Sequence, residues 1–170
     1  MKAPGRRRTR PTVSVADGEK VLAWAESTTG QVVAGTRDAF YVTAPGSADG
    51  TRLPWEQVEA ADWDRDTAQL RVSEVGAWGE ARVEHTLTIE EPGKLLELVR
   101  ERVTASVVLQ RHVPISGRRG LRVIARRAPR GDRPLAWFYE YDEGVDPHDP
   151  EVRAAAAAAL AAARDEVGHA

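Results

Sequence analysis

Arginine is the residue type in this sequence best suited to binding chemistry, because a guanidinium holds phosphate or carboxylate through two parallel hydrogen bonds. Residues 100–133 contain ten basic residues and two acidic ones. Arg122 and Arg126 are an even number of positions apart, so in a strand they share one face of the sheet. The sequence therefore predicts a basic patch that binds a partner. Its candidate binding residues are Arg118, Arg119, Arg122, Arg126 and Arg127, and Arg111, Arg130 and Arg133 complete the set.

Two interpretations of this arginine patch stay open. In the first, acidic residues such as Glu140 and Asp142, on the adjacent predicted strand and at its end, pair with the arginines and leave the patch neutral. In the second, the guanidinium groups stay free and contact the phosphates of a nucleic acid, with binding that weakens steeply as salt is added. Whether carboxylates of the same chain neutralise these arginines therefore decides if the patch has a structural or a binding role.

Trp78 is the other candidate partner-binding residue. It lies in a predicted loop between Gly76 and Gly79, whereas most of the remaining tryptophans are expected in the core, where aromatic side chains bury much apolar area. An indole exposed on a loop is typical of a surface that contacts another molecule.

Residues that carry catalysis or bind metals are missing or wrongly spaced. The chain has no cysteine, which excludes disulfides, zinc–thiolate sites, iron–sulfur clusters and thiol nucleophiles. The four histidines lack metal-binding spacing. The acidic run 62–67 lacks the glycine that a calcium loop needs at its sixth position, where Thr67 stands. We therefore expect no metal, no cofactor and no catalytic residue.

Composition places the chain among globular proteins. Of its 170 residues, 42% are hydrophobic and 29% are charged, and the formal net charge is −2. This length suits one domain or two small packed units. No stretch approaches the roughly 18 apolar residues of a membrane span, and no apolar run follows the basic start. We therefore expect no membrane span, a cytoplasmic location, and a disordered basic arm over residues 1–17.

Hydrophobic periodicity divides the rest of the chain. Short β-rich segments separated by turn residues follow one another over 18–89, as expected for antiparallel strands. After Pro92 the pattern becomes that of an amphipathic helix, with Leu96, Val99, Val103 and Val107 on one stripe. Three further strands are predicted over 109–115, 121–126 and 135–141, and a helix capped by Asp149 over 151–167.

This order of about seven short strands and one helix resembles the bacterial pleckstrin-homology-like (GRAM-like) domains. Residues 36–42 (TRDAFYV) resemble a turn that leads into a strand of these proteins, and residues 53–58 (LPWEQV) resemble a step between two strands. The resemblance covers about residues 18–108, and the whole chain is similar to uncharacterised actinobacterial proteins. It implies an α+β fold, in which a bent β-sandwich with a capping helix is extended over 109–170 by a three-stranded antiparallel section and a C-terminal helix.

The resemblance also implies a binding module and not an enzyme. Lipid-binding members carry basic residues on the first two strands and their connecting loop, but here residues 27–31 have none, so phosphoinositide binding is not expected. Residues 94–167 match the element order of the double-stranded RNA-binding domain, yet acidic residues precede the last helix where that domain contacts phosphates.

These observations lead to one main hypothesis and one alternative. We expect a non-catalytic cytoplasmic module for protein interaction or scaffolding, whose partner the sequence does not name. The alternative is a protein that associates with RNA through the arginine patch and the basic N-terminal arm. An enzyme is the weakest hypothesis, because it requires a deep pocket that holds two ionisable groups with shifted pKa values.

Overall fold

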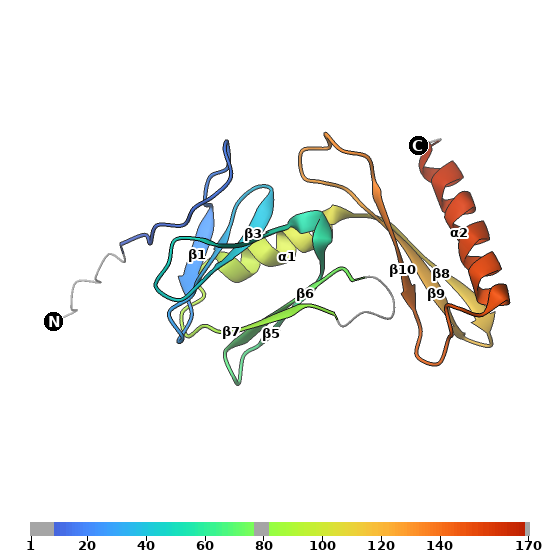
Figure 1. Cartoon of the computed structure of the whole chain (residues 1–170), viewed down its shortest axis with the longest axis horizontal. Helices are drawn as coiled ribbons and strands as arrows, with labels where there is room; N and C mark the ends of the chain where they lie inside the picture. Colours follow the sequence, from blue (N-terminus) through green and yellow to red (C-terminus); the bar gives the residue numbers. More distant parts are fainter. Residues whose placement is uncertain (1–8, 77–81, 169–170) are drawn as a thin grey trace.

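The computed structural model describes residues 9–76 and 82–168, and it combines three antiparallel sheets with two α-helices (Figure 1). The expected α+β class is confirmed. Two sheets and the first helix form an N-terminal unit, and the third sheet and the second helix form a C-terminal unit beside it. Seven strands precede the first helix, in the order that the sequence predicted. Kinship with pleckstrin-homology-like domains stays a prediction.

The N-terminal unit is built from two sheets connected by the short 3-10 helix η1 (Trp55–Gln57). The first sheet contains, in spatial order, β1 (Ala23–Glu26), β2 (Val32–Gly35), β3 (Ala39–Thr43) and β4 (Gly50–Pro54). The second contains β5 (Val58–Asp64), β6 (Gln69–Glu74) and β7 (Glu84–Thr88). In this order β5 is an edge strand, paired on one side with β6.

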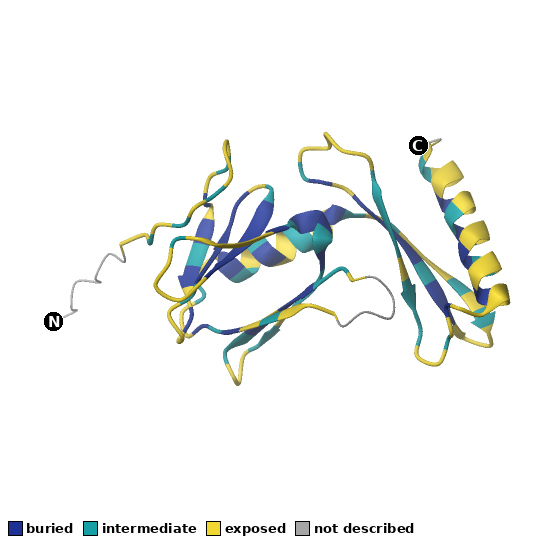
Figure 2. Ribbon diagram, viewed as in Figure 1, coloured by how far each residue is buried: buried dark blue, intermediate teal, exposed yellow. Residues whose placement is uncertain are grey.

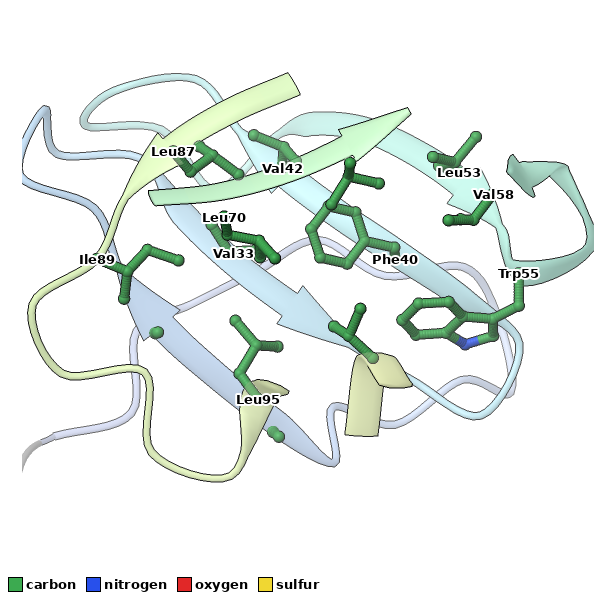
Figure 3. Close-up of a cluster of buried hydrophobic side chains, with 14 residues drawn as sticks. Val33, Phe40, Val42, Leu53, Trp55, Val58, Leu70, Leu87, Ile89 and Leu95 are labelled. Atoms are coloured by element: carbon green, nitrogen blue, oxygen red, sulfur yellow. The ribbon is translucent and has the colours of Figure 1, made fainter. Parts of the chain in front are cut away.

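Both sheets share one hydrophobic core (Figure 3). Trp55 is fully buried, and its ring lies against Phe40 with 5.9 Å between the centroids. The indole N–H donates a hydrogen bond of 3.0 Å to the carbonyl of Thr36, so the one polar atom of this large side chain is satisfied inside the core. Trp55, the tryptophan of the 53–58 segment, therefore anchors the connection between the two sheets.

Helix α1 (Leu95–Ser106) follows β7 and packs its apolar stripe against this core. Leu95 and Val99 are buried there, as the periodicity after Pro92 predicts. The helix ends at Ser106, whereas the stripe suggested continuation through Val107. Val107 instead begins the next strand, because its φ and ψ are extended.

Helix α1 lies close to the first sheet at Gly35 of β2. A Cβ atom at this position would lie 2.6 Å from Cδ2 of Leu98 and 3.3 Å from Cζ2 of Trp55. Only the absence of a side chain leaves room for the helix here, so this glycine sets the distance between α1 and the sheet.

The C-terminal unit is a three-stranded sheet with one helix on one face. Its elements are β8 (Val107–Ser116), β9 (Arg119–Arg126), β10 (Ala136–Tyr141) and α2 (Pro150–Gly168), with β9 in the centre of the sheet. The carboxylate of Asp149 accepts a hydrogen bond of 2.8 Å from the backbone N–H of Glu151, so the predicted cap is confirmed.

Alanines of α2 face both the sheet and the solvent. Ala156, Ala159 and Ala163 are buried against Leu121 and Val123 of β9, where their small side chains let the helix lie close to the strands. The opposite side of the helix is exposed along its length (Figure 2).

The two units are in direct contact at several places. Ser106, the last residue of α1, is followed at once by β8. Arg126 at the end of β9 donates hydrogen bonds to the Ser106 hydroxyl and to the carbonyl of Glu59 in β5. Arg130, in the loop after β9, pairs with Asp38 of the N-terminal unit.

Part of the expected basic arm lies on the first sheet. Val13 and Val15 pack beside a small buried cluster that includes Tyr41, and the backbone N–H of Ser14 donates a hydrogen bond of 2.9 Å to the carbonyl of Ala48. The segment that contains these valines is therefore ordered, contrary to the expectation of disorder through residue 17. Residues 1–8 of the arm lie outside the described residues.

Neither helix is long and apolar enough to span a bilayer, as far as the described residues 9–76 and 82–168 are concerned.

Candidate functional site

The candidate arginines do not gather in one patch. Arg118 and Arg119 lie at the turn between β8 and β9, and Arg127 lies just beyond the opposite end of β9. At about 3.3 Å per residue, the eight residues of β9 separate these two places by roughly 26 Å. The arginines of the expected patch are therefore divided between the two ends of β9.

Most of the remaining arginines are neutralised within the molecule. Arg122 pairs with Glu140 at 3.4 Å and with Asp142 at 3.9 Å, which confirms the first of the two interpretations for this residue. The other ion pairs of the set are Arg111 with Glu166 (2.5 Å), Arg130 with Asp38 (2.6 Å) and Arg133 with Glu56 (3.9 Å).

Arg126 is buried, with 4% of its surface exposed, so it is not available to a partner as the sequence suggested. Strand alternation does place it on the same face as Arg122, but this end of the face is covered by α1 and β5. Burial lowers the pKa of its guanidinium, and hydrogen bonds to Ser106 and to Glu59 hold it at the junction of the two units.

Three candidate arginines keep their charge unpaired among the described residues: Arg118, Arg119 and Arg127. A Cβ at Gly144 would lie 3.0 Å from Nη1 of Arg119, so this guanidinium lies along the loop between β10 and α2. Trp78, the remaining candidate, lies outside the described residues.

A hollow of apolar character lies between β5 and α1, and we call it the α1–β5 groove. It has a volume of about 890 Å³. Trp63 of β5 and Leu70 of β6 line it from the sheet, and Leu96 and Val99 line it from the helix. Trp63 and Leu96 are only partly buried, so apolar surface is open to solvent here.

Charged residues at the α1–β5 groove are predominantly acidic. Asp62, Glu97 and Glu101 line it together with a single arginine, Arg100. None of these three acids forms an ion pair with another residue in the described part of the chain. The groove therefore combines an apolar floor with a net negative rim, next to a strand edge that carries no further strand.

A second hollow, of about 440 Å³, lies where the loop of residues 128–133 meets the N-terminal unit. Burial alone would raise the pKa of Glu19, but hydrogen bonds from Thr36, Arg52 and Tyr41 lower it below its usual value. Two hydrogen bonds from Arg130, of 2.8 and 2.6 Å, likewise hold the pKa of Asp38 low.

Two histidines have carboxylate partners that sequence reasoning missed. His112 lies 2.9 Å from Asp142, and His85 lies 2.7 Å from Glu74. The hydrogen bond with His112, with a second from the backbone of Gly120, lowers the pKa of Asp142. These partners come from neighbouring strands or the end of a strand, so no local sequence signal reveals them. Across the described residues, no group of three or more potential ligands is placed to hold a metal ion.

Comparison of the chain with protein-family models, with curated proteins and with solved structures finds no match in any of the three. The site must therefore be interpreted from its own geometry.

Proposed function

We propose that this protein is a non-catalytic interaction module whose α1–β5 groove binds an extended, cationic segment of a partner protein. The observation that carries the proposal is the groove itself, about 890 Å³ of largely apolar surface left open between a helix and an edge strand. Open apolar surface of this kind marks sites of protein contact more often than it marks ordinary monomer surface. A cytoplasmic location stays a prediction.

The arrangement of the groove favours a segment in β conformation. Its backbone would pair with the free edge of β5, and every second side chain would then point toward Trp63 and Leu96. Main-chain hydrogen bonds supply affinity in this mode, and the pockets for alternate side chains supply specificity.

The acidic rim favours positive charge on the partner. Asp62, Glu97 and Glu101 outnumber Arg100, and complementary charge both accelerates association and disfavours acidic segments. A segment with alternating basic and apolar residues matches both the rim and the floor.

The other two hypotheses have less support. The RNA alternative relied on a concentrated arginine surface, whereas Arg111, Arg122, Arg130 and Arg133 are engaged with carboxylates and Arg126 is buried. For an enzyme, Glu19 and Asp38 are two ionisable groups with shifted pKa values in one hollow, but both shifts are downward. Both groups therefore stay ionised at neutral pH and are poorly matched to proton transfer there.

The test uses a nine-residue capped peptide of alternating lysine and valine, titrated into the full chain and followed by backbone amide shifts in NMR spectra. We expect shifts concentrated in residues 60–64 and 96–105. Substituting glutamate for lysine in the peptide removes the charge match and weakens binding about tenfold or more. N-methylation of alternate peptide amides weakens binding if the β5 edge is used.

The variant Thr104→Arg places a bulky cation at the groove, and we expect it to weaken binding of the lysine–valine peptide about tenfold. The matched control is Ala158→Arg, the same introduced residue on an exposed face of α2. Equal affinity for the lysine and glutamate peptides, or equal loss in both variants, would refute the proposal.

A further inference from the structure

A small cavity of about 130 Å³ lies at the C-terminal end of α1, against the start of the loop that follows β9, and we call it the arginine cavity. Its lining residues are Arg102, Ala105, Ser106, Arg127, Ala128 and Pro129. At roughly 30 Å³ per water molecule this is room for about four waters, which is also enough for one tetrahedral or planar oxyanion. The cavity is distinct from the α1–β5 groove, although Ala105 lines both.

The side chain of Arg102, which lines the arginine cavity, carries a hydrogen-bond donor without an acceptor. The Nε atom of Arg102 is buried and has no hydrogen-bond partner among the residues that the structure describes. A buried charged donor without an acceptor costs more free energy than a neutral one, and native proteins rarely leave such groups unsatisfied. The arginine cavity is the place where an acceptor from outside the chain can approach this guanidinium.

Two guanidinium groups at the arginine cavity have no ion pair among the described residues, whereas the charges of Glu59 and Glu140 act on the third, that of Arg126. Arg102 and Arg127 form no ion pair with any described residue, and the buried Arg126 lies behind Ser106 with a third guanidinium. The nearby carboxylate of Glu59 is already paired with Arg82 at 2.9 Å. The end of α1 contributes only about half a negative charge, too little to compensate the two unpaired guanidinium groups of Arg102 and Arg127.

We propose that the arginine cavity is a binding site for a small oxyanion, a phosphate or carboxylate group, held by Arg102 and Arg127. The Ser106 hydroxyl donates to the carbonyl of Val103 and accepts from Arg126, so it positions Arg126 and leaves the two other arginines as the ligands. Arg127 is exposed at the mouth of the cavity, so the remainder of a larger ligand stays outside. This site goes beyond the proposed peptide binding and does not depend on it.

The experiment titrates inorganic phosphate, O-phosphoserine and acetate into the full chain at constant ionic strength, with chloride as the reference anion. The side-chain Nε–H resonances of the arginines in ¹⁵N NMR spectra report binding directly. We expect saturable shifts for Arg102 and Arg127, and about tenfold or greater loss of affinity in Arg127→Gln and in Arg102→Gln. The matched control is Arg118→Gln, which removes the same charge at the far end of β9 and leaves affinity unchanged.

Each outcome decides the proposal. Saturable binding of phosphate and phosphoserine alone assigns the site to phosphate groups, and binding of acetate as well assigns it to oxyanions in general. Arginine Nε–H resonance shifts that match those caused by chloride would overturn the proposal of an oxyanion site. Equal anion affinity in Arg127→Gln, Arg102→Gln and the wild type would overturn it as well. Thr104→Arg distinguishes this proposal from peptide binding, because that variant blocks the groove and leaves the oxyanion ligands in place.

Discussion

Among the individual residues, arginines have the most varied roles in this protein. Arg122 pairs with carboxylates on the surface of the sheet, Arg126 is buried between the two units, and Arg118 is exposed on a turn. These differences come from what lies across the fold from each guanidinium and not from the residue or its neighbours in sequence. The net charge of a sequence segment is therefore a poor guide to the charge that this segment presents to a partner on the protein surface.

Replacement of Arg126 tests its structural role. We expect Arg126→Ala to lower the free energy of unfolding by about 2–4 kcal/mol, because it leaves a cavity and removes hydrogen bonds to Ser106 and to the carbonyl of Glu59. Urea denaturation measures the change. Arg127→Ala, the neighbouring and exposed position, is the control and should stay within about 0.5 kcal/mol of wild type. Equal effects of the two substitutions would contradict the assignment.

At the scale of elements, the placement of α1 determines what remains open. The helix buries Leu95 and Val99 in the core but leaves Leu96 partly exposed, so the space beside β5 is not filled. Its position depends on Gly35, which allows the contact with Leu98.

Gly35→Ala tests this dependence. The added methyl carbon would lie 2.6 Å from Cδ2 of Leu98, so the helix or the leucine must shift, and we expect a loss of about 1–3 kcal/mol in unfolding free energy. A shift of the helix, in contrast to a shift of the Leu98 side chain alone, would also change the affinity of the lysine–valine peptide.

Gly76→Ala is the comparison for Gly35→Ala, because a methyl group there meets, among the residues that the structure describes, only Arg82 Cα at 4.0 Å. Thermal denaturation of both variants measures the difference, and a Gly35→Ala protein as stable as Gly76→Ala would refute the packing argument.

The sequence predicted the elements well and their mutual contacts poorly. Periodicity located the helix after Pro92 and the strands on either side, because alternation and a 3.6-residue repeat are local properties. It did not predict that Arg126 is buried or that His112 meets Asp142, because those contacts depend on which strands pair. The α1–β5 groove was missed for the same reason. Its one signal was Trp63, one of the tryptophans of which most were expected in the core, and its side chain is only partly buried.

At the scale of the whole molecule, the two units are held together by polar contacts as well as by the chain. Asp38 and Arg130 are 92 residues apart and join the first sheet to the loop after β9. Hydrogen bonds from Arg130 hold the pKa of Asp38 below its usual value, so protonation of Asp38 must weaken this contact.

The pH dependence of stability follows from that shift. The folded pKa of Asp38 lies below its unfolded value of about 4, so its contribution is complete above that pH and is lost as pH falls through the folded pKa. Arg130→Gln removes the contribution, and we expect the stability difference between wild type and variant to shrink as pH falls from 6 toward 3. Urea midpoints measured across this range provide the test.

Arg118→Gln also removes one positive charge, but Arg118 forms no ion pair among the described residues. The stability difference between this variant and wild type should therefore change less with pH. A difference for Arg130→Gln that stays constant down to pH 3 would contradict the assignment.

The direct passage from Ser106 to Val107 has a mechanical consequence. With no linker between α1 and β8, a rotation of the helix axis turns the first residues of β8 with it, and β9 follows through its ladder with β8. The orientation of the C-terminal sheet is therefore tied to the direction of α1 at this junction.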